Sequence, residues 1–317
     1  MLVFWILFNL FALSLLGLDL LVFHRRGRVM RPREAIGWSA FWIALAAIFA
    51  TLTLSWQGRQ VALQFITGYV LELSLSIDNL FLFLVIFRYF SVPEQYQHSI
   101  LFWGILGAML TRGVFILAGV DLIQHFHWVL YVLAAVLIIS GVRFAFAGGH
   151  QLDPRDNPVV RVMRRWIPVT HDYQNGKFFV RVWKGREPTQ NREAGRGRHI
   201  LYATPLLLVL AVIETTDLVF AFDSIPAVLA VTRSAFIAYT SNVFAILGLR
   251  SMYFAVSGLV RNFRFLHTGL AIVLILIGIK MIAESYYPIS TLATLGAVTL
   301  IIGASIAASL ALPAKAK

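Results

Sequence analysis

The sequence contains no cysteine and few charged side chains. Asp, Glu, Lys and Arg make up 13% of its 317 residues, whereas hydrophobic residues make up 59%. A soluble domain carries about 25% charged residues, so this composition argues against a soluble globule. Without cysteine the chain forms no disulfide and offers no thiolate ligand to a metal.

The hydrophobic residues are grouped into runs long enough to cross a membrane as helices. Nine such runs lie near residues 2–23, 36–54, 63–87, 98–120, 128–147, 203–225, 234–257, 266–283 and 289–312. We therefore predict an all-α polytopic membrane protein with about nine transmembrane helices. Basic residues follow the first run instead of preceding it. A secretory signal has the opposite order, so we expect this run to be retained.

The basic residues predict how the chain crosses the membrane. If the loop 24–35 is cytoplasmic, alternating crossings place 21 of the 27 Lys and Arg residues inside and leave only Arg59 and Arg233 outside. This bias follows the positive-inside rule. The N-terminus is then outside and the C-terminus cytoplasmic. The cytoplasmic position of the basic residues also accounts for the net charge of +12, because these residues form a rim that faces anionic inner-leaflet lipid. We therefore expect no nucleic-acid partner.

Two acidic stretches interrupt the apolar runs. The first extends from Glu72 to Asn79 and the second from Glu214 to Pro226. A charged group in the middle of a membrane costs about 2.5–3.5 kcal/mol. The carboxylates are therefore neutralised by protons, paired with internal cations, or used to bind a cation that moves. The five carboxylates are Glu72, Asp78, Glu214, Asp217 and Asp223.

The two stretches belong to an internal repeat. Aligning Asp217 with Glu72 also aligns Asp223 with Asp78, and the similarity continues through three runs on each side. Because an odd number of helices reverses direction, the two units are predicted to be inverted relative to each other, as in many secondary transporters. The predicted parts are two N-terminal helices (1–60), repeat 1 (61–147), a basic cytoplasmic loop (148–202), repeat 2 (203–284) and a C-terminal helix (285–317).

The residue types of the two stretches indicate which ligand they suit. They offer carboxylate, hydroxyl and amide oxygens without His or Cys, a set that favours hard divalent cations such as Mn²⁺, Mg²⁺ or Ca²⁺. Residues six apart do not share a helix face. Either the helix unwinds near Pro226, or the two acids of each pair have different roles. Alternatively, the acids form ion pairs with Arg112, Arg143, Arg250 and Lys280.

The loop 148–202 is the only sizeable polar segment. In residues 159–167 the apolar side chains fall on one helix face and the arginines elsewhere, as in a short amphipathic helix, although a plain linker fits equally well. Residues 177–184 could form one strand of a hairpin, and 185–198 is rich in Arg, Gly and Glu, as a flexible segment would be. The loop contains no catalytic signature.

The acidic motifs resemble those of the TerC/Alx family of integral membrane proteins. These motifs are E-x-S-L-x-x-D-N at Glu72–Asn79 and E-x-x-D-x-x-F-A-x-D-S-I-P at Glu214–Pro226. The resemblance implies a bacterial inner-membrane protein linked to Mn²⁺ efflux, in a family named after tellurium resistance. Leu73 departs from the pattern, because a basic residue can follow the first Glu. The metal-site candidates that the resemblance implies are Glu72, Asp78, Asn79, Glu214, Asp217, Asp223 and Ser224.

We therefore expect a carrier that exports Mn²⁺ or a similar hard divalent cation through a carboxylate site between two inverted repeats. One alternative is a membrane subunit that docks partners through the basic loop. Another is a proton-coupled exporter of small solutes. We find no enzyme signature such as H-E-x-x-H and expect no bound cofactor. The sequence leaves the oligomeric state open.

Overall fold

The computed structural model describes residues 2–24, 32–126, 128–146, 163, 165, 168–170, 173, 176–184, 198–256, 265–284, 287 and 289–311. Long helices account for most of these residues. Their bounds are α1 (Leu2–His24), α2 (Pro32–Gln57), α3 (Arg59–Tyr89), α4 (Glu94–His125), α5 (Val129–Phe146), α7 (Pro205–Leu229), α8 (Ala235–Val256), α9 (Leu266–Ala283) and α10 (Thr291–Ala311). Each of these helices falls on one of the expected apolar runs.

Several helices are built to cross a membrane. In the described part of the chain, five are long and apolar enough to do so: Glu34–Gln57, Glu94–His125, Pro205–Leu229, Ala235–Ala255 and Thr291–Ser309. Large apolar side chains also lie exposed on the outside of the bundle, among them Leu110, Val114 and Leu300. Such a surface suits lipid and not water. The protein is therefore an all-α integral membrane protein, and the count of nine crossings stays a prediction.

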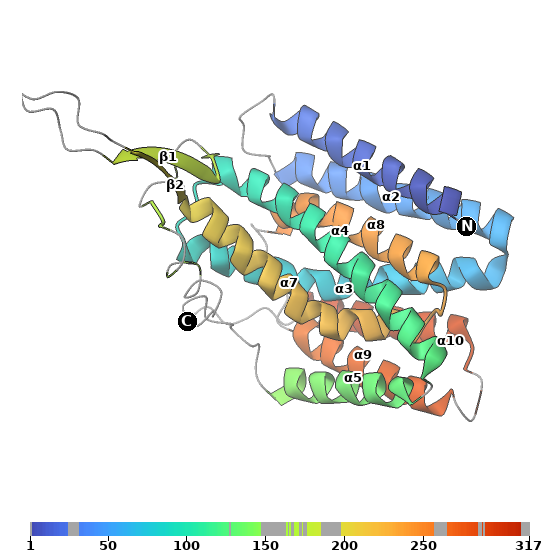
Figure 1. Ribbon diagram of the computed structural model, residues 1–317. Helices are drawn as coiled ribbons and strands as arrows, with labels where there is room; N and C mark the ends of the chain where they lie inside the picture. The colour runs from blue at the N-terminus through green and yellow to red at the C-terminus, as the bar shows by residue number, and fades with distance from the viewer. Residues whose placement is uncertain are drawn as a thin grey trace, which may run out of the picture.

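The helices form three groups that lie side by side (Figure 1). In the central group, α3 packs against α8 and α4 against α7, with further contacts between α3 and α7 and between α4 and α8. Helices α1 and α2 cover the α8 side of this group. Helices α5, α9 and α10 cover the other side, where α5 packs along α9. The acidic stretches lie on α3 and α7, so the fold places both in the central group.

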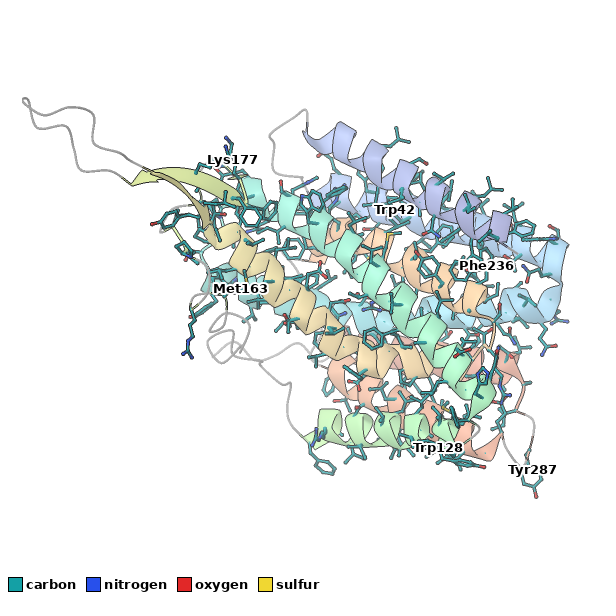
Figure 2. The ribbon with its side chains drawn as sticks, in the orientation of Figure 1. Trp42, Trp128, Met163, Lys177, Phe236 and Tyr287 are labelled. Carbon is teal, nitrogen blue, oxygen red and sulfur yellow. The ribbon has the colours of Figure 1, made fainter. Side chains whose placement is uncertain are left out.

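Aromatic side chains fill the contact between the N-terminal helices and the central group. The Phe49 ring lies 5.0 Å from both Phe65 on α3 and Phe244 on α8, measured between ring centroids. Trp42 is buried on the same helix, α2 (Figure 2). These rings bury large apolar areas without polar groups. They fix α2 against the two helices that it covers.

Helices α3 and α7 are continuous through both acidic stretches. Pro226 lies inside α7, and every residue from Pro205 to Leu229 is α-helical. Of the two alternatives left open by the sequence, an unwound segment near Pro226 is therefore wrong. Backbone groups freed at membrane depth need new partners, and an intact helix keeps all but one of the bonds that unwinding would break. On α7, Asp217 and Asp223 consequently point to different sides of the helix.

A two-stranded hairpin extends from one end of the helical bundle (Figure 1). Strand β1 (Phe179–Lys184) pairs antiparallel with β2 (Arg198–Ala203), which confirms the strand expected at 177–184. Thr204 donates a hydrogen bond to the carbonyl of Lys177 at 2.7 Å, and the Tyr173 hydroxyl donates to the carbonyl of Phe90. Burial raises the pKa of the Tyr173 phenol, so it remains a donor at neutral pH.

Lys177 marks the end of the bundle that carries this hairpin, whereas Tyr287 lies at the opposite end (Figure 2). Most of the expected amphipathic helix at 159–167 lies outside the described residues, as does nearly all of the 185–198 segment. Among the described residues of the loop, the hydrogen bonds of Tyr173 and Thr204 hold the base of the hairpin.

Glycines allow α5 and α9 to approach each other closely. A Cβ added at Gly141 on α5 would come within 2.6 Å of Ile275 and 2.8 Å of the Ala271 carbonyl. A Cβ added at Gly278 on α9 would come within 2.7 Å of Ile138 on α5. Small residues at such crossings are the usual means of close helix packing in membranes. Both glycines are thus required for the observed helix separation.

We expect Gly141→Ala to destabilise the protein, because the added methyl group meets a backbone carbonyl that cannot move aside easily. Gly296→Ala on α10 is the matched control, since a Cβ there meets nothing within 4 Å. Thermal unfolding of the purified proteins in detergent measures the effect. A loss of several degrees in the midpoint is expected for Gly141→Ala alone. Equal midpoints for the two variants would contradict the packing described.

Candidate functional site: a buried ion cluster

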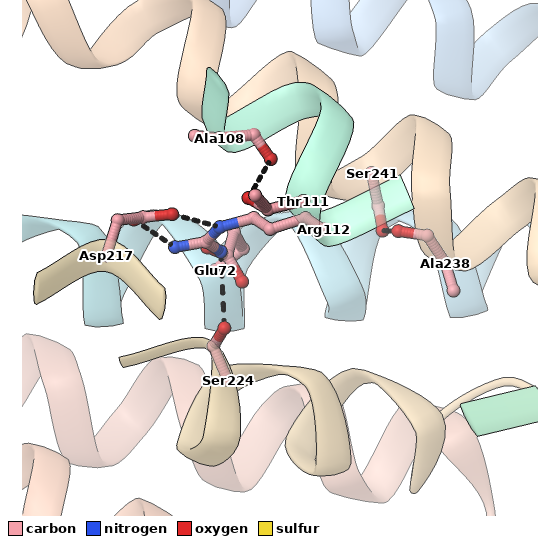
Figure 3. A network of polar contacts seen from close by, with 8 residues as sticks. All are labelled: Glu72, Ala108, Thr111, Arg112, Asp217, Ser224, Ala238 and Ser241. Carbon is pink, nitrogen blue, oxygen red and sulfur yellow. Dashed lines mark hydrogen bonds and ion pairs between the residues drawn. The ribbon is translucent and has the colours of Figure 1, made fainter. Parts of the chain in front are cut away.

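A buried arginine lies at the centre of the four helices α3, α4, α7 and α8. Arg112 is on α4, and only 1% of its surface is exposed. Its side chain reaches Glu72 on α3 and both Asp217 and Ser224 on α7 (Figure 3). We call these four residues the Arg112 cluster. It joins three helices through one side chain.

The guanidinium group of Arg112 engages Asp217 with two hydrogen bonds. Nη2 donates to Oδ1 at 2.8 Å and Nε donates to Oδ2 at 3.2 Å. Nη1 forms an ion pair with Oε1 of Glu72 and lies 3.2 Å from the Ser224 hydroxyl oxygen. The paired fork of arginine fits a carboxylate in this way, which fixes geometry as well as charge.

Helix periodicity explains which residues of α7 belong to the cluster. Asp217 and Ser224 are seven residues apart, close to two full turns, so they share one face. Asp223 is rotated by about 100° from Ser224. It faces α5 instead, where it accepts a hydrogen bond of 2.5 Å from Ser140. On α7 the paired acids Asp217 and Asp223 therefore have different partners, Arg112 and Ser140.

The Arg112 cluster contains more acid than base. Two carboxylates, Glu72 and Asp217, surround one guanidinium, which leaves one negative charge when both acids are ionised. Within the described residues, the second oxygen of Glu72 and the hydroxyl of Ser76 are buried and have no hydrogen-bond partner. Buried polar groups of this kind normally have partners. The cluster therefore has capacity for a further cation or polar ligand.

A small cavity adjoins the cluster. Its volume is about 20 Å³, and Ser76, Arg112 and Asp217 supply its polar lining. Apolar residues of α4, α7 and α8 complete the wall, including Ile213 and Leu249. About one water molecule fits in such a volume. The open hydroxyl of Ser76 is thus next to a space that one small ligand can fill.

The other predicted site residues lie outside the cluster. Glu214 is partly buried against α4, where its carboxylate occupies the place that a side chain at Gly107 would need. Asn79 is buried on α3. The side chain of Asp78 lies outside the described residues. The fold therefore brings together Glu72, Asp217 and Ser224 but not Glu214 or Asp223.

These residues do not form a metal cage in the described structure. Among the described residues, no three His, Cys, Asp or Glu side chains are placed to hold one ion. The alternative of internal pairing is realised for Glu72 and Asp217, through Arg112. Lys280, another expected partner, instead donates to the Ala230 carbonyl at 2.7 Å and pairs with Glu284 at 3.0 Å. It thereby caps the C-terminal end of α7.

The predicted ligand set left out two buried polar residues of the central helices. Ser76 lies one turn from Glu72 and lines the cavity. Asn242 on α8 is buried, and neither its amide nitrogen nor its oxygen has a partner within the described residues. Each is a polar residue inside an apolar run, and that signal could have singled them out. The sequence did not reveal that their polar atoms would be left open.

Comparison with known proteins adds the family. The model of the "Integral membrane protein TerC family" matches residues 57–317, which include every residue of the Arg112 cluster. The chain belongs to the TerC family. The resemblance inferred from the two acidic motifs is thereby confirmed. No solved structure matches the chain.

Several TerC family relatives match nearly the whole chain. An "Uncharacterized membrane protein STKORF319" of Myxococcus xanthus is 43% identical over 306 residues, which cover 96% of this chain and 91% of the relative. A "Putative membrane-bound redox modulator Alx" of Escherichia coli (strain K12) is 41% identical over 303 residues, covering 93% and 90% respectively. The protein of the same name in Salmonella typhi is 42% identical over 304 residues, covering 93% and 89%. The similarity thus extends beyond the acidic motifs.

We expect Asp217→Asn to destabilise this TerC family protein strongly, by about 3–5 kcal/mol, because it leaves Arg112 buried with one of its carboxylates removed. Asp121→Asn is the control, since Asp121 and its partner His125 are both exposed and such pairs contribute little. Thermal unfolding in detergent distinguishes them. A variant Asp217→Asn as stable as Asp121→Asn would mean that the cluster does not support the fold.

Proposed function

We propose that the protein exports Mn²⁺, or a similar hard divalent cation, from the cytoplasm through the Arg112 cluster. The observation that carries this proposal is the surplus acid at its centre. Glu72 and Asp217 are both buried between membrane helices, with one guanidinium shared between them. Charge at this depth is costly and usually marks an ion pathway or proton relay.

The chemistry of the surrounding groups favours a hard cation. Carboxylates and the hydroxyls of Ser76 and Ser224 supply oxygen ligands. Such ligands suit Mn²⁺, Mg²⁺ and Ca²⁺. The family resemblance of the acidic motifs implies Mn²⁺ among these. Glu214, Asp223, Asn79 and Asp78 remain proposed ligands for other steps along the same path.

The packing of the helices supports an inverted repeat as the transport device. Gly141 on α5 contacts Ile275 and Ala271 on α9, while Gly278 on α9 contacts Ile138 and Ala134 on α5. The two sets are equivalent when α5 is aligned with α9, as expected for contacts across a two-fold axis. Helices α3 and α4 likewise pack on α8 and α7. In such folds the site lies between the repeats, and access alternates as one repeat rocks against the other.

The proposed orientation follows the basic residues. The hairpin end of the bundle would face the cytoplasm, with the N-terminus outside and the C-terminus inside a bacterial inner membrane. The hairpin carries Lys177 and Arg181, both exposed. Anionic lipid of the inner leaflet would lie beside them. An ion bound from this side reaches the Arg112 cluster between α3 and α7.

A second candidate function is the docking of a protein partner through the hairpin. Phe179 and Leu201 are 48% and 54% exposed on the paired strands. The relatives called Alx are named as redox modulators, and a thiol-based redox role here would need a partner's thiols, because this chain has no cysteine. Deleting residues 185–198 discriminates the two functions. A carrier retains Mn²⁺ flux after the deletion, whereas a folded wild-type protein that shows no Mn²⁺ flux would favour the docking function.

We expect Glu72→Gln to abolish Mn²⁺ flux, because it removes one of the two charges that balance a divalent ion. The measurement is Mn²⁺ uptake into inside-out proteoliposomes, with and without a pH gradient, with Asp121→Asn as the active control. We expect Mn²⁺ uptake by the control but not by Glu72→Gln. The dependence of the control's uptake on the pH gradient reports proton coupling. Full uptake by folded Glu72→Gln would remove the cluster from the ion path.

A further inference from the structure

The position of Arg112 restricts how the cluster can bind an ion. Both oxygens of Asp217 and one oxygen of Glu72 are already engaged by its guanidinium. We propose that Arg112 is a built-in competitor of the transported cation: it occupies the two carboxylates of the empty carrier and must leave before the cation binds. This inference rests on the proposed function and concerns the state of the empty carrier.

The ligand count argues against joint occupation. With Arg112 in place, the hydroxyl of Ser76 is the open side-chain oxygen among the described residues that line the cavity. The second oxygen of Glu72 is also buried without a partner among the described residues, but Glu72 does not belong to the lining. Hard divalent cations take about six oxygen ligands or more. The adjoining cavity of about 20 Å³ has room for roughly one water molecule. A divalent cation therefore lacks both ligands and space until the guanidinium withdraws from Asp217.

The charge balance leads to the same conclusion. Two carboxylates match one divalent cation, so an ion that replaces Arg112 leaves Glu72 and Asp217 neutralised. An ion added beside Arg112 would instead give a buried site with a net positive charge. Two cations at contact distance repel strongly in a medium of low dielectric constant. Replacement of the Arg112 guanidinium by the cation is thus favoured over binding of the cation beside it.

Arginine is well suited to this role. Its guanidinium cannot lose its proton in a protein, so the competitor is present at every physiological pH. Its flexible stem lets the head group leave and return, and its fork restores the same bidentate contact with Asp217. Ser224, 3.2 Å from Nη1, holds the other side of the head group. The empty carrier consequently never exposes two unpaired carboxylates to the membrane interior.

Removing the competitor should separate binding from turnover. A variant with a neutral side chain at Arg112 binds the cation more tightly, because no internal charge has to be displaced. Its empty form carries two uncompensated carboxylates, and reorientation of that form is slowed. Net flux then falls, while exchange of bound for free Mn²⁺ continues, since exchange never requires the empty form to reorient. A residue that only supports the fold would lower affinity, exchange and net flux together.

The test compares wild type, Arg112→Gln, Arg112→Lys and Arg250→Gln. Arg250 is also a buried arginine, on α8, and it is not one of the four residues of the Arg112 cluster. Free Mn²⁺ is measured by electron paramagnetic resonance with purified protein at pH 8. Net uptake and Mn²⁺–Mn²⁺ exchange are measured in proteoliposomes. Size-exclusion chromatography reports folding for each variant.

We expect Arg112→Gln to lower the dissociation constant for Mn²⁺ by about tenfold or more, a coupling of usual size, to lose net uptake and to keep exchange. Arg112→Lys, which keeps the charge but loses the fork, should bind about threefold more tightly than wild type. Arg250→Gln should show no tightening. Unchanged or weaker Mn²⁺ binding by folded Arg112→Gln overturns the inference.

Two further outcomes complete the test. If Arg112→Gln does not fold, Arg112→Lys decides, and unchanged or weaker binding by that variant overturns the inference. If wild-type protein neither binds nor moves Mn²⁺, the proposed function fails and this inference fails with it. Wild-type flux without tighter binding in either Arg112 variant overturns the competitor role alone.

Discussion

The ion pair between Arg112 and Asp217 is the interaction on which the centre of this protein depends. A membrane interior offers no water to a charged side chain, so each charge must find its partner within the protein. Arg112 meets this constraint with two hydrogen bonds to Asp217 and an ion pair with Glu72. Arg112 lies on α4, Asp217 on α7 and Glu72 on α3. Their mutual dependence fixes how these helices lie relative to one another.

Close helix packing makes this arrangement possible. Gly104 and Gly107 on α4 face Ile213 and Glu214 on α7, and Gly68 on α3 faces Ser241 on α8. Larger residues at these positions would separate the helices and lengthen the reach of Arg112. The glycines thus connect the packing of the backbone to the geometry of the charges. A change in either would alter how readily the guanidinium leaves Asp217, which is the step that we assign to ion binding.

Much of the architecture was predictable because it follows from composition and periodicity. Apolar runs predicted where the helices lie, and a strand within 177–184 was recognisable from its alternating residues. The acidic motifs also identified the family correctly. The site was less predictable. Sequence spacing shows which residues share a helix face, but not which face meets another helix, so the choice of Arg112 as the partner of Asp217 needed the fold.

The sequence could not decide between a broken and a continuous helix at Pro226 for a related reason. A proline removes one backbone hydrogen bond, but the surrounding helices decide whether the chain breaks there, and α7 is continuous. Open polar atoms at Ser76 and Asn242 likewise depend on what packs around them. Whether a buried polar side chain finds a hydrogen-bond partner depends on how the helices assemble, whereas the sequence records only the residue types.

The most direct test of this account is a structure of the protein with Mn²⁺ bound, with the ion located by its anomalous scattering. The account predicts an ion between the carboxylates of Glu72 and Asp217, near Ser76, with the Arg112 guanidinium withdrawn from Asp217. An ion bound elsewhere, or an ion at this site with the bidentate contact of Arg112 intact, would contradict it.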